Sequence, residues 1–351
     1  MLFNIEKDEG HRIHAYVVPD GYSGIPTVRI YSGETLVLRC SANESRQALV
    51  DAGRHETGLC GFNIGPEMAP SLIDLPDLLI VEDDTNLLIY RRPKRDRIHR
   101  KILRLETHLF PLARFDECFH NHMQYVQTGL DQFGRETVTQ IFQLNEIDSI
   151  YVSGRLLYKN FAYWIENGFD MALMIHHPYD ELAERLLVLS FLRENAEKIL
   201  GARDALHFAP ALKFAAGLSF ENDRALKRSL LDMPSNVAGL LTDPLVRQLT
   251  AASPQDMASS ASVPAALDVL ASCGVVGLRH DPDYFQQAMA TWLTINSKKL
   301  SLPPAFPRVA SLALFLQESR TVDHLLERDL EVYETVRNAM GGWDKNRRCA
   351  K

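Results

Sequence analysis

Residues Met171–Ile175 form an unbroken apolar run that stops at His176-His177-Pro178. Such a run is typical of a strand covered on both faces, as in a parallel sheet. Pro178 suits the first turn of a helix, because proline has no N–H to leave unpaired there. Leucines from Leu182 to Leu189 then follow at roughly helical spacing. A strand that leads directly into a helix N-terminus predicts an anion site, since free N–H groups and the helix dipole point at the ligand.

Two further apolar runs, Ile150–Val152 and Val275–Leu278, also stop at polar residues. We expect all three runs to be buried neighbouring strands of a mainly parallel sheet, with their carboxyl ends at one cleft. Helix-like patterns cover roughly residues 181–200, 282–295 and 307–340. This alternation predicts an α-rich α/β domain.

The first part of the chain has a different pattern. β-forming residues cluster at Thr27–Tyr31 and Thr35–Cys40, on either side of the turn signal Ser32-Gly33. The segment Arg46–Phe62 loosely resembles part of a small β-sandwich module found beside bacterial glycosyltransferases. The sequence therefore predicts two domains, a β-rich domain over residues 1–93 and an α/β domain over residues 94–351.

A run of basic residues lies at the predicted boundary, from Arg91 to Lys101. We expect this run to lead into a helix that continues through Leu103, Leu105 and Leu109. Two interpretations stay open, a solvated linker and helix face, or an anion site for a phosphate or an acidic glycan. Residues 250–264 are rich in Ser, Ala and Pro without periodicity, which predicts either a flexible connector or a mobile lid.

Composition excludes several classes of protein. The net charge of −7 and the pI near 6.0 argue against general nucleic-acid binding. No apolar run reaches the about 20 residues needed to cross a bilayer, and the N-terminus lacks a signal-peptide pattern. The five cysteines are scattered without a CxxC pair, and motifs of serine hydrolases, NTPases, Rossmann dehydrogenases and zinc proteases are missing. We therefore expect a cytoplasmic protein with no transmembrane segment and no metal centre.

Several short segments together resemble the carbohydrate sulfotransferases of the Golgi and of bacteria. That family has a G-H-x-P-Y-G turn, then a strand that ends in R-D/N-P-x-x-R-x-x-S, then N-x-Q-T-R-x-L, V-V-G-L and D-x-x-L-Y segments. The corresponding segments of this chain, which together span about residues 145–340, are Gly154–Lys159, His176–Glu184, Asn236–Leu241, Ala265–Leu278 and Asp329–Tyr333.

This resemblance implies a P-loop-like sulfotransferase fold and the donor 3′-phosphoadenosine 5′-phosphosulfate (PAPS). It implies that Arg155 and His176 bind donor phosphates, and Arg91 and Arg92 complete the predicted cofactor-binding set. Sulfuryl transfer needs a cation at the leaving phosphate and a base for the sugar hydroxyl. The candidate catalytic residues are therefore Lys94 as the cation and Glu136 as the base.

The chain departs from the family at both donor motifs. His176 stands in place of a phosphate-binding arginine, and Glu184 stands in place of a serine. The nearest match to the family's glycine-rich P-K-T/S-G loop is Pro93-Lys94, which follows the strand pattern Leu87–Tyr90 but has no glycine or hydroxyl after it. Bulky residues keep the backbone away from a phosphate, and a carboxylate repels it. The sequence therefore predicts a degenerate donor site.

The leading hypothesis is a sulfotransferase-like protein of bacterial surface-polysaccharide biosynthesis whose donor site is degenerate. One alternative is an active PAPS-dependent glycan sulfotransferase. The other is a glycan-binding or partner-binding assembly protein that keeps the fold. The expected partner is a glycan or polysaccharide, or a protein of polysaccharide assembly.

Overall fold

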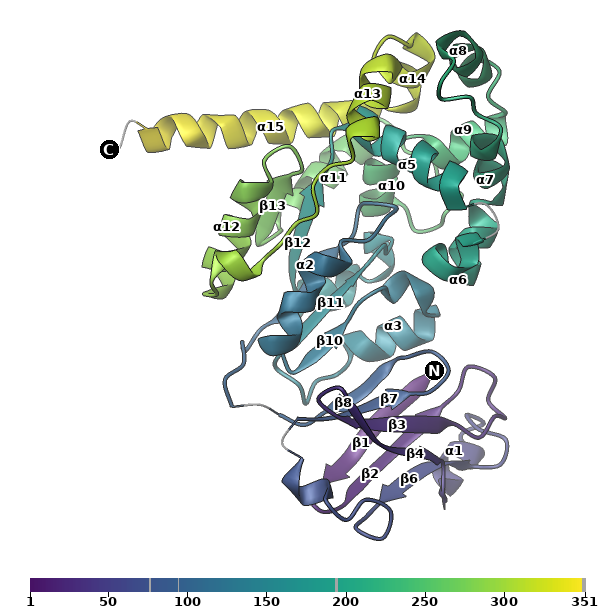
Figure 1. The fold of residues 1–351 in the computed structure, drawn as a ribbon, viewed down its shortest axis with the longest axis vertical. Helices are drawn as coiled ribbons and strands as arrows, with labels where there is room; N and C mark the ends of the chain where they lie inside the picture. Colours follow the sequence, from purple (N-terminus) through teal and green to yellow (C-terminus); the bar gives the residue numbers. More distant parts are fainter. Residues whose placement is uncertain (76, 94, 193–194, 349–351) are drawn as a thin grey trace. The chain divides into compact units, whose positions relative to one another are not determined.

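The computed structural model describes residues 1–75, 77–93, 95–192 and 195–348, and its fold is mixed α/β (Figure 1). The chain divides into two compact units. Unit 1 comprises Met1–Lys101, Phe119–Gln127 and Phe133–Val152. Unit 2 comprises Ile102–Cys118, Thr128–Gln132 and the chain from Ser153 onward.

Unit 1 contains two four-stranded antiparallel sheets, with the orders β1-β2-β6-β5 and β4-β3-β7-β8. Their strands are β1 (Leu2–Asp8), β2 (Ile13–Val18), β3 (Thr27–Ser32), β4 (Thr35–Ser41), β5 (Glu44–Ser45), β6 (Leu59–Ile64), β7 (Leu78–Glu82) and β8 (Leu88–Arg91). The predicted hairpin is confirmed, because β3 and β4 pair around Gly33, whose φ of +58° suits glycine. In β2, Ile13, Ala15 and Val17 are buried and alternate with less buried residues, as expected of a strand with one face in a core.

Short helical elements complete unit 1. They are α1 (Gln47–Asp51), η1 (Leu72–Asp74) and α3 (Arg135–Phe142), together with most of η2 (Cys118–Asn121). Val138 and Ile141 of α3 are buried, one helical turn apart. The polar residues before them belong to the same helix, since Gly134 is its N-cap and Glu136 lies in its first turn.

A five-stranded parallel sheet has the order β10-β11-β9-β12-β13. Its strands are β9 (Lys101–Leu105), β10 (Tyr125–Gln127), β11 (Ile150–Gly154), β12 (Asp170–Ile175) and β13 (Val275–Leu278). The three apolar runs are therefore strands of one parallel sheet, as predicted, and they are almost entirely buried. β12 and β13 are neighbours, but β9 lies between β11 and β12.

The prediction of a helix through Leu103, Leu105 and Leu109 is wrong. Leu103 and Leu105 lie in β9, where every residue after Lys101 is buried. Arg104, between them, is only 2% exposed, and its charge is neutralised by the carboxylates of Glu106 and Asp116. Leu109 follows the strand and lies in a loop.

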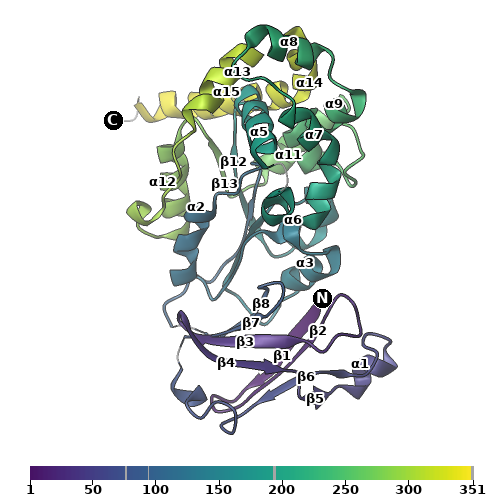
Figure 2. The same ribbon diagram turned by 45° about the vertical axis from the view of Figure 1, so that its right-hand side comes forward.

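Helices make up most of unit 2, and Figure 2 shows several of them gathered above the parallel strands. They are α2 (Ala113–Glu117), α4 (Ala162–Glu166), α5 (Pro178–Leu192), α6 (Ala196–His207), α7 (Ala209–Ala216), α8 (Asp223–Leu231), α9 (Ser235–Leu241), α10 (Pro244–Thr250), α11 (Ser262–Ala271), α12 (Pro282–Leu293), α13 (Pro307–Leu316), α14 (Arg320–Leu325) and α15 (Glu327–Arg348), with the short helices η3 (Leu130–Gln132), η4 (Tyr158–Asn160) and η6 (Ser297–Lys299). No helix in the described ranges is both long and apolar enough to span a membrane.

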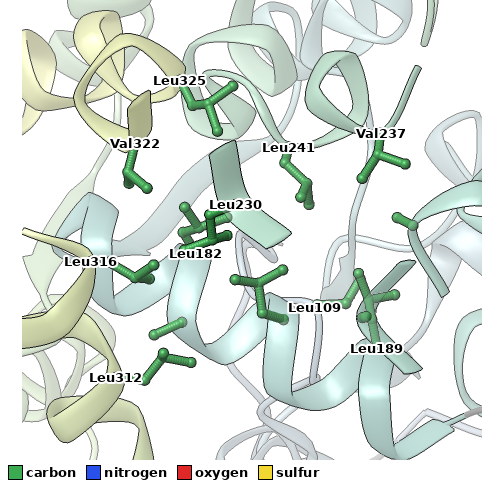
Figure 3. Packing of buried hydrophobic residues seen from close by; sticks show 14 of the residues in the cluster. Leu109, Leu182, Leu189, Leu230, Val237, Leu241, Leu312, Leu316, Val322 and Leu325 are labelled. Carbon is green, nitrogen blue, oxygen red and sulfur yellow. The ribbon is translucent and has the colours of Figure 1, made fainter. Parts of the chain in front are cut away.

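A leucine-rich core joins helices α5 to α9 with α13 and α14 (Figure 3). Leu182 and Leu189 of α5 are buried in this cluster, and so are Leu316 and Val322. Leu109 is fully buried in the same cluster, although it comes from the loop after β9. Burying a leucine stabilises a fold by about 1.5–3 kcal/mol, so this contact anchors that loop to the helices.

The Ser/Ala/Pro-rich segment is tied to the helix before it. Arg247 of α10 donates to the carbonyls of Pro254 and Asp256 within the segment, and to the carbonyl of Gly239 at 2.5 Å. The Asp256 carboxylate accepts the N–H groups of Ala252 and Ser253 at 3.0 Å each. Residues 251–256 therefore form a hydrogen-bonded loop rather than an unstructured connector.

Candidate functional site

Two loops of unit 2 meet at the carboxyl ends of β9 and β12. Glu106–Leu112 follows β9, and His176-His177 links β12 to α5. The strands pair in parallel, so both loops leave the sheet at the same edge. The carboxyl edge of a parallel sheet is where open α/β folds bind their ligands. We therefore take this edge as the candidate site.

Arg104, Glu106, Asp116 and Ser153 form a buried network of ion pairs and hydrogen bonds at the start of the first loop. The Arg104 guanidinium donates to both oxygens of the Asp116 carboxylate, with Nε–Oδ1 and Nη2–Oδ2 distances of 2.8 Å. It also donates to Glu106 Oε2 at 2.9 Å. The Ser153 hydroxyl donates to Asp116 Oδ2 at 2.7 Å. All four residues are at most 2% exposed, so they interact in a medium of low dielectric constant, where such contacts are strong.

The Glu106 carboxylate receives donors from its own loop. The backbone N–H of Leu112 donates to Oε2 at 2.9 Å, and the N–H of His108 donates to Oε1 at 3.3 Å. The His108 ring nitrogen Nδ1 lies 2.6 Å from Oε1. Burial alone would raise the pKa of Glu106, but the charges of Arg104 and His108 hold it well below its ordinary value. Glu106 is therefore an anion enclosed by the loop that follows β9.

Two histidines with opposite pKa shifts face each other at the site. The rings of His108 and His176 are edge to face, with centroids 3.9 Å apart. Burial lowers the pKa of His108, but the Glu106 carboxylate outweighs this effect and raises it. Burial and the charge of His108 hold the pKa of His176 well below its ordinary value. His176 is thus neutral near pH 7, and neither of its ring nitrogens has a hydrogen-bond partner.

A small cavity opens beside His176. Its volume, measured as the space open to the centre of a water molecule, is about 10 Å³, and the wider hollow around it, including open solvent, measures about 270 Å³. The lining residues come from both loops and from α5, α10 and α15: Thr107, Ile175, His176, Pro178, Glu181, Arg185, Leu245 and Asp329. About 10 Å³ is close to the least space that admits one water-sized group.

Carboxylates surround this cavity. Glu181 Oε1 accepts from Arg185 Nε at 2.5 Å, while Glu181 Oε2 is buried without a hydrogen bond and lies 3.9 Å from His176 Nδ1. Glu184 Oε2 lies 4.0 Å from His176 Nδ1. Burial, with the neighbouring charge of Glu181, raises the pKa of Glu184 to about 7. Burial also raises the pKa of Asp329 to about 7, although two backbone N–H groups oppose that shift.

Of the predicted site residues that the structure describes, only His176 lines this cavity. Arg155 also lies in unit 2, but its Nη2 donates to Asp131 Oδ2 at 2.9 Å and to Asp204 Oδ2 at 2.8 Å, and its Nη1 donates to the Leu109 carbonyl. Burial would lower the pKa of Arg155, but those two carboxylates raise it. Arg155 is therefore already paired with two anions.

The other predicted residues within the described ranges do not line the cavity either. Arg91 and Arg92 end or follow β8 in unit 1, where Arg91 pairs with Asp77 at 2.9 Å and Arg92 pairs with Asp8 at 2.8 Å. Glu136 is in α3 of unit 1 and pairs with Arg54 at 2.9 Å. Lys94 lies outside the described residues.

The charged residues that do build the site were missed by sequence reasoning. Glu106 and His108 follow directly after β9, which contains Arg104, as His176 follows β12. That shared pattern was a usable signal, but the short run Ile102-Leu103 was interrupted by the arginine and was read as part of a helix. Asp329 begins the segment Asp329–Tyr333 that resembles the family's D-x-x-L-Y segment, but nothing in the sequence placed it at the site, which it reaches from α15.

The arrangement can accept and move protons, and it can hold a small polar group. Among the described residues, no group of three or more His, Cys, Asp or Glu side chains is arranged to bind a metal ion. A comparison with protein-family models and a search of curated proteins both found no match for this chain.

Proposed function

We propose that this chain is a sulfotransferase-like protein of surface-polysaccharide biosynthesis. On this proposal, carboxylates of the protein occupy the positions where the family binds the phosphates of PAPS. On this proposal it binds a glycan or an assembly partner and does not transfer a sulfuryl group from PAPS. The sulfotransferase part rests on the resemblance of the motifs around Gly154 and His176. It is supported by a parallel sheet in which β9 and β12 are neighbours and both end at the candidate site.

The observation that carries the proposal is the enclosed carboxylate of Glu106. Phosphate-binding loops after a first parallel strand cradle their anion with backbone N–H groups. Here the N–H groups of His108 and Leu112 donate to Glu106 instead, together with Arg104. A phosphosulfate in this loop would have to displace a buried ion that already has its hydrogen bonds, and breaking such a pair costs about 3–5 kcal/mol.

The second donor motif is also acidic. Glu184 takes the place of the family's serine, and its Oε2 lies 4.0 Å from His176 Nδ1. Like charges about 4 Å apart repel by on the order of 4 kcal/mol at an effective dielectric constant of ~20. Because the pKa of Glu184 is raised to about 7, this repulsion is fully present only above that pH, where it weakens binding roughly a thousandfold. A neutral His176 does not offset it.

Calorimetry with 3′,5′-ADP, the desulfated product of PAPS, tests the proposal. We expect wild-type protein to bind it more weakly than millimolar. The E184S variant restores the family's residue and should bind it more tightly than wild type. The E197S variant removes an exposed carboxylate of α6 and should leave the binding unchanged. A micromolar dissociation constant for the wild type would instead support an active PAPS-dependent sulfotransferase.

The binding role has its own test. Surface-polysaccharide fragments should stabilise the purified protein against heat, because a ligand that binds only the folded state raises the melting temperature. Fragments that leave the melting temperature unchanged at millimolar concentration would contradict glycan binding. The remaining alternative, binding to a protein of polysaccharide assembly, would then be tested by a pull-down.

A further inference from the structure

Strand β4 is an open edge of its antiparallel sheet. The order β4-β3-β7-β8 gives β4 the neighbour β3 on one side, and no strand of the described residues pairs with it on the other. The register of β4 shifts once, at Val37, and residues 38–41 after it pair regularly with β3. An open edge of regular backbone is a surface on which another extended strand can pair.

The backbone groups of Arg39 and Ser41 face this open side. Just beyond the strand, the N–H of Ala42 donates to the Pro26 carbonyl at 2.9 Å, which continues the ladder between β4 and β3. Antiparallel hydrogen bonds to one neighbour involve every second residue, so Cys40 bonds to β3 as Ala42 does, and Arg39 and Ser41 point the other way. Among the described residues, the backbone N–H and C=O groups of Arg39 and Ser41 have no hydrogen-bond partner.

Residues 38–41 lack the features that usually prevent a second strand from pairing. Proteins protect exposed edges with proline, lysine or bulges. Residues 38–41 contain no proline and no lysine, and the bulge at Val37 lies before them. Their one charge, on Arg39, is paired within the same sheet, since Arg39 Nε donates to Asp83 Oδ2 at 3.0 Å. This stretch of the edge is therefore free to pair.

Apolar side chains of the core reach this edge. Val28 and Ile30 of β3 are 1% and 0% exposed, and they pair with Cys40 and Leu38 of β4. Cys40 is buried, whereas Leu38 is only partly covered. A strand added beside β4 would cover Leu38 further and remove apolar surface from water, which favours pairing.

A second copy of the chain matches this edge. When two β4 strands pair antiparallel about a two-fold axis at Cys40, Arg39 of each copy lies opposite Ser41 of the other. These are the residues whose backbone groups point outward, so each opposed pair exchanges hydrogen bonds in both directions. Arginine then faces serine, and no like charges lie directly opposite each other, which would be destabilising.

We propose that β4 is a homodimer interface, in which the β4 strands of two copies pair antiparallel about Cys40 and join their sheets into one. An interface made by two short strands is small, so the dimer is weak and forms as the protein concentration rises. The two-fold pairing uses both open edges, so it stops at the dimer. This interface belongs to unit 1 and is independent of the proposed function.

Sedimentation velocity of the full chain, from micromolar to millimolar concentration, tests the dimer. Wild type should shift from monomer to dimer across this range. The S41P variant removes an outward N–H and leaves the bonds to β3 intact, because proline is tolerated at an edge position whose N–H faces solvent. Each S41P dimer loses a hydrogen bond from both copies, so its association constant should fall about tenfold or more. S41A keeps the N–H, serves as the matched control and should dimerise like wild type.

Oxidation of wild type by copper–phenanthroline in air gives a second measurement, which decides should S41P fail to fold. Opposed Cys40 residues in a non-hydrogen-bonded pair have Cα atoms about 4.5 Å apart, within the range that a disulfide bridges. Peptide mass spectrometry should therefore find a dimer cross-linked through Cys40. A chain that stays monomeric at millimolar concentration, a dimer that S41P leaves unchanged, or cross-links only through other cysteines would each overturn the interface.

Discussion

Asp243 and Asp329 each cap the helix that begins beside the other. The Asp243 carboxylate accepts the N–H groups of Arg328 at 3.0 Å and of Asp329 at 3.2 Å, at the start of α15. The Asp329 carboxylate accepts the N–H groups of Leu245 at 3.0 Å and of Val246 at 2.8 Å, at the start of α10. The first turns of helices far apart in the sequence are thereby locked together, next to the cavity that Asp329 lines.

We expect substitutions at Asp243 to destabilise the protein in the order D243A, then D243N, then wild type. Alanine removes the carboxylate that accepts both backbone N–H groups and the Arg328 side chain, so it should lower the free energy of unfolding by about 3 kcal/mol. Asparagine keeps the side-chain oxygen that accepts the two backbone N–H groups, and it tolerates the left-handed φ of 42°. Its effect should therefore be smaller. Urea unfolding measures both. Equal stability of D243A and wild type would show that the reciprocal caps contribute little.

The buried network under the Glu106 loop predicts that R104K is damaging. Lysine cannot reproduce the two-pronged contact to Asp116 while also reaching Glu106. We expect a loss of about 2–4 kcal/mol in the free energy of unfolding. The control is R308K, at an exposed ion pair with Glu221, where the change should stay within about 0.5 kcal/mol. Similar losses in the two variants would contradict a special role for the buried network.

Two glycines of unit 2 should respond to alanine in opposite ways. A Cβ at Gly154 would lie 2.6 Å from the Leu130 backbone nitrogen, which cannot move aside cheaply, so G154A should destabilise the protein by several kcal/mol, on the order of overpacking. A Cβ at Gly239, inside α9, meets nothing within 4 Å, so G239A should stabilise it by about 0.5–1 kcal/mol. Thermal melting compares the two, and a stable G154A would mean that β11 and η3 can separate.

An element could be predicted from the sequence when the residues that stabilise it lie close together in the chain. β12 and the β3–β4 hairpin were predictable because their signals, an apolar run and a glycine turn, are local. β9 was not, because the burial of Arg104 depends on Asp116, 12 residues away, as well as on Glu106. Arg155 likewise looked like a free cation until Asp204, 49 residues away, was placed beside it. Charge pairing over such separations leaves no periodic pattern to read.

Glu184 should make stability depend on pH. Burial and the charge of Glu181 raise the pKa of Glu184 from its ordinary 4.5 to about 7. The folded state therefore holds a proton that the unfolded chain releases. The resulting stabilisation is fully present below about pH 4.5 and is lost as the pH rises through about 7. E184Q keeps a neutral group at every pH, so between pH 5 and pH 8 its stability should fall less than that of wild type, by up to about 3 kcal/mol.

Other charged groups face Glu184, namely Glu181, Glu106, His108 and Arg279. They are all present in E184Q, so the difference between the two proteins isolates Glu184. E197Q, at an exposed position of α6, serves as the control and should follow the wild-type curve. The measurement is urea unfolding at each pH. Parallel curves for wild type and E184Q would mean that Glu184 ionises as freely in the folded protein as in the unfolded chain, and that the acidic potential around the cavity is screened.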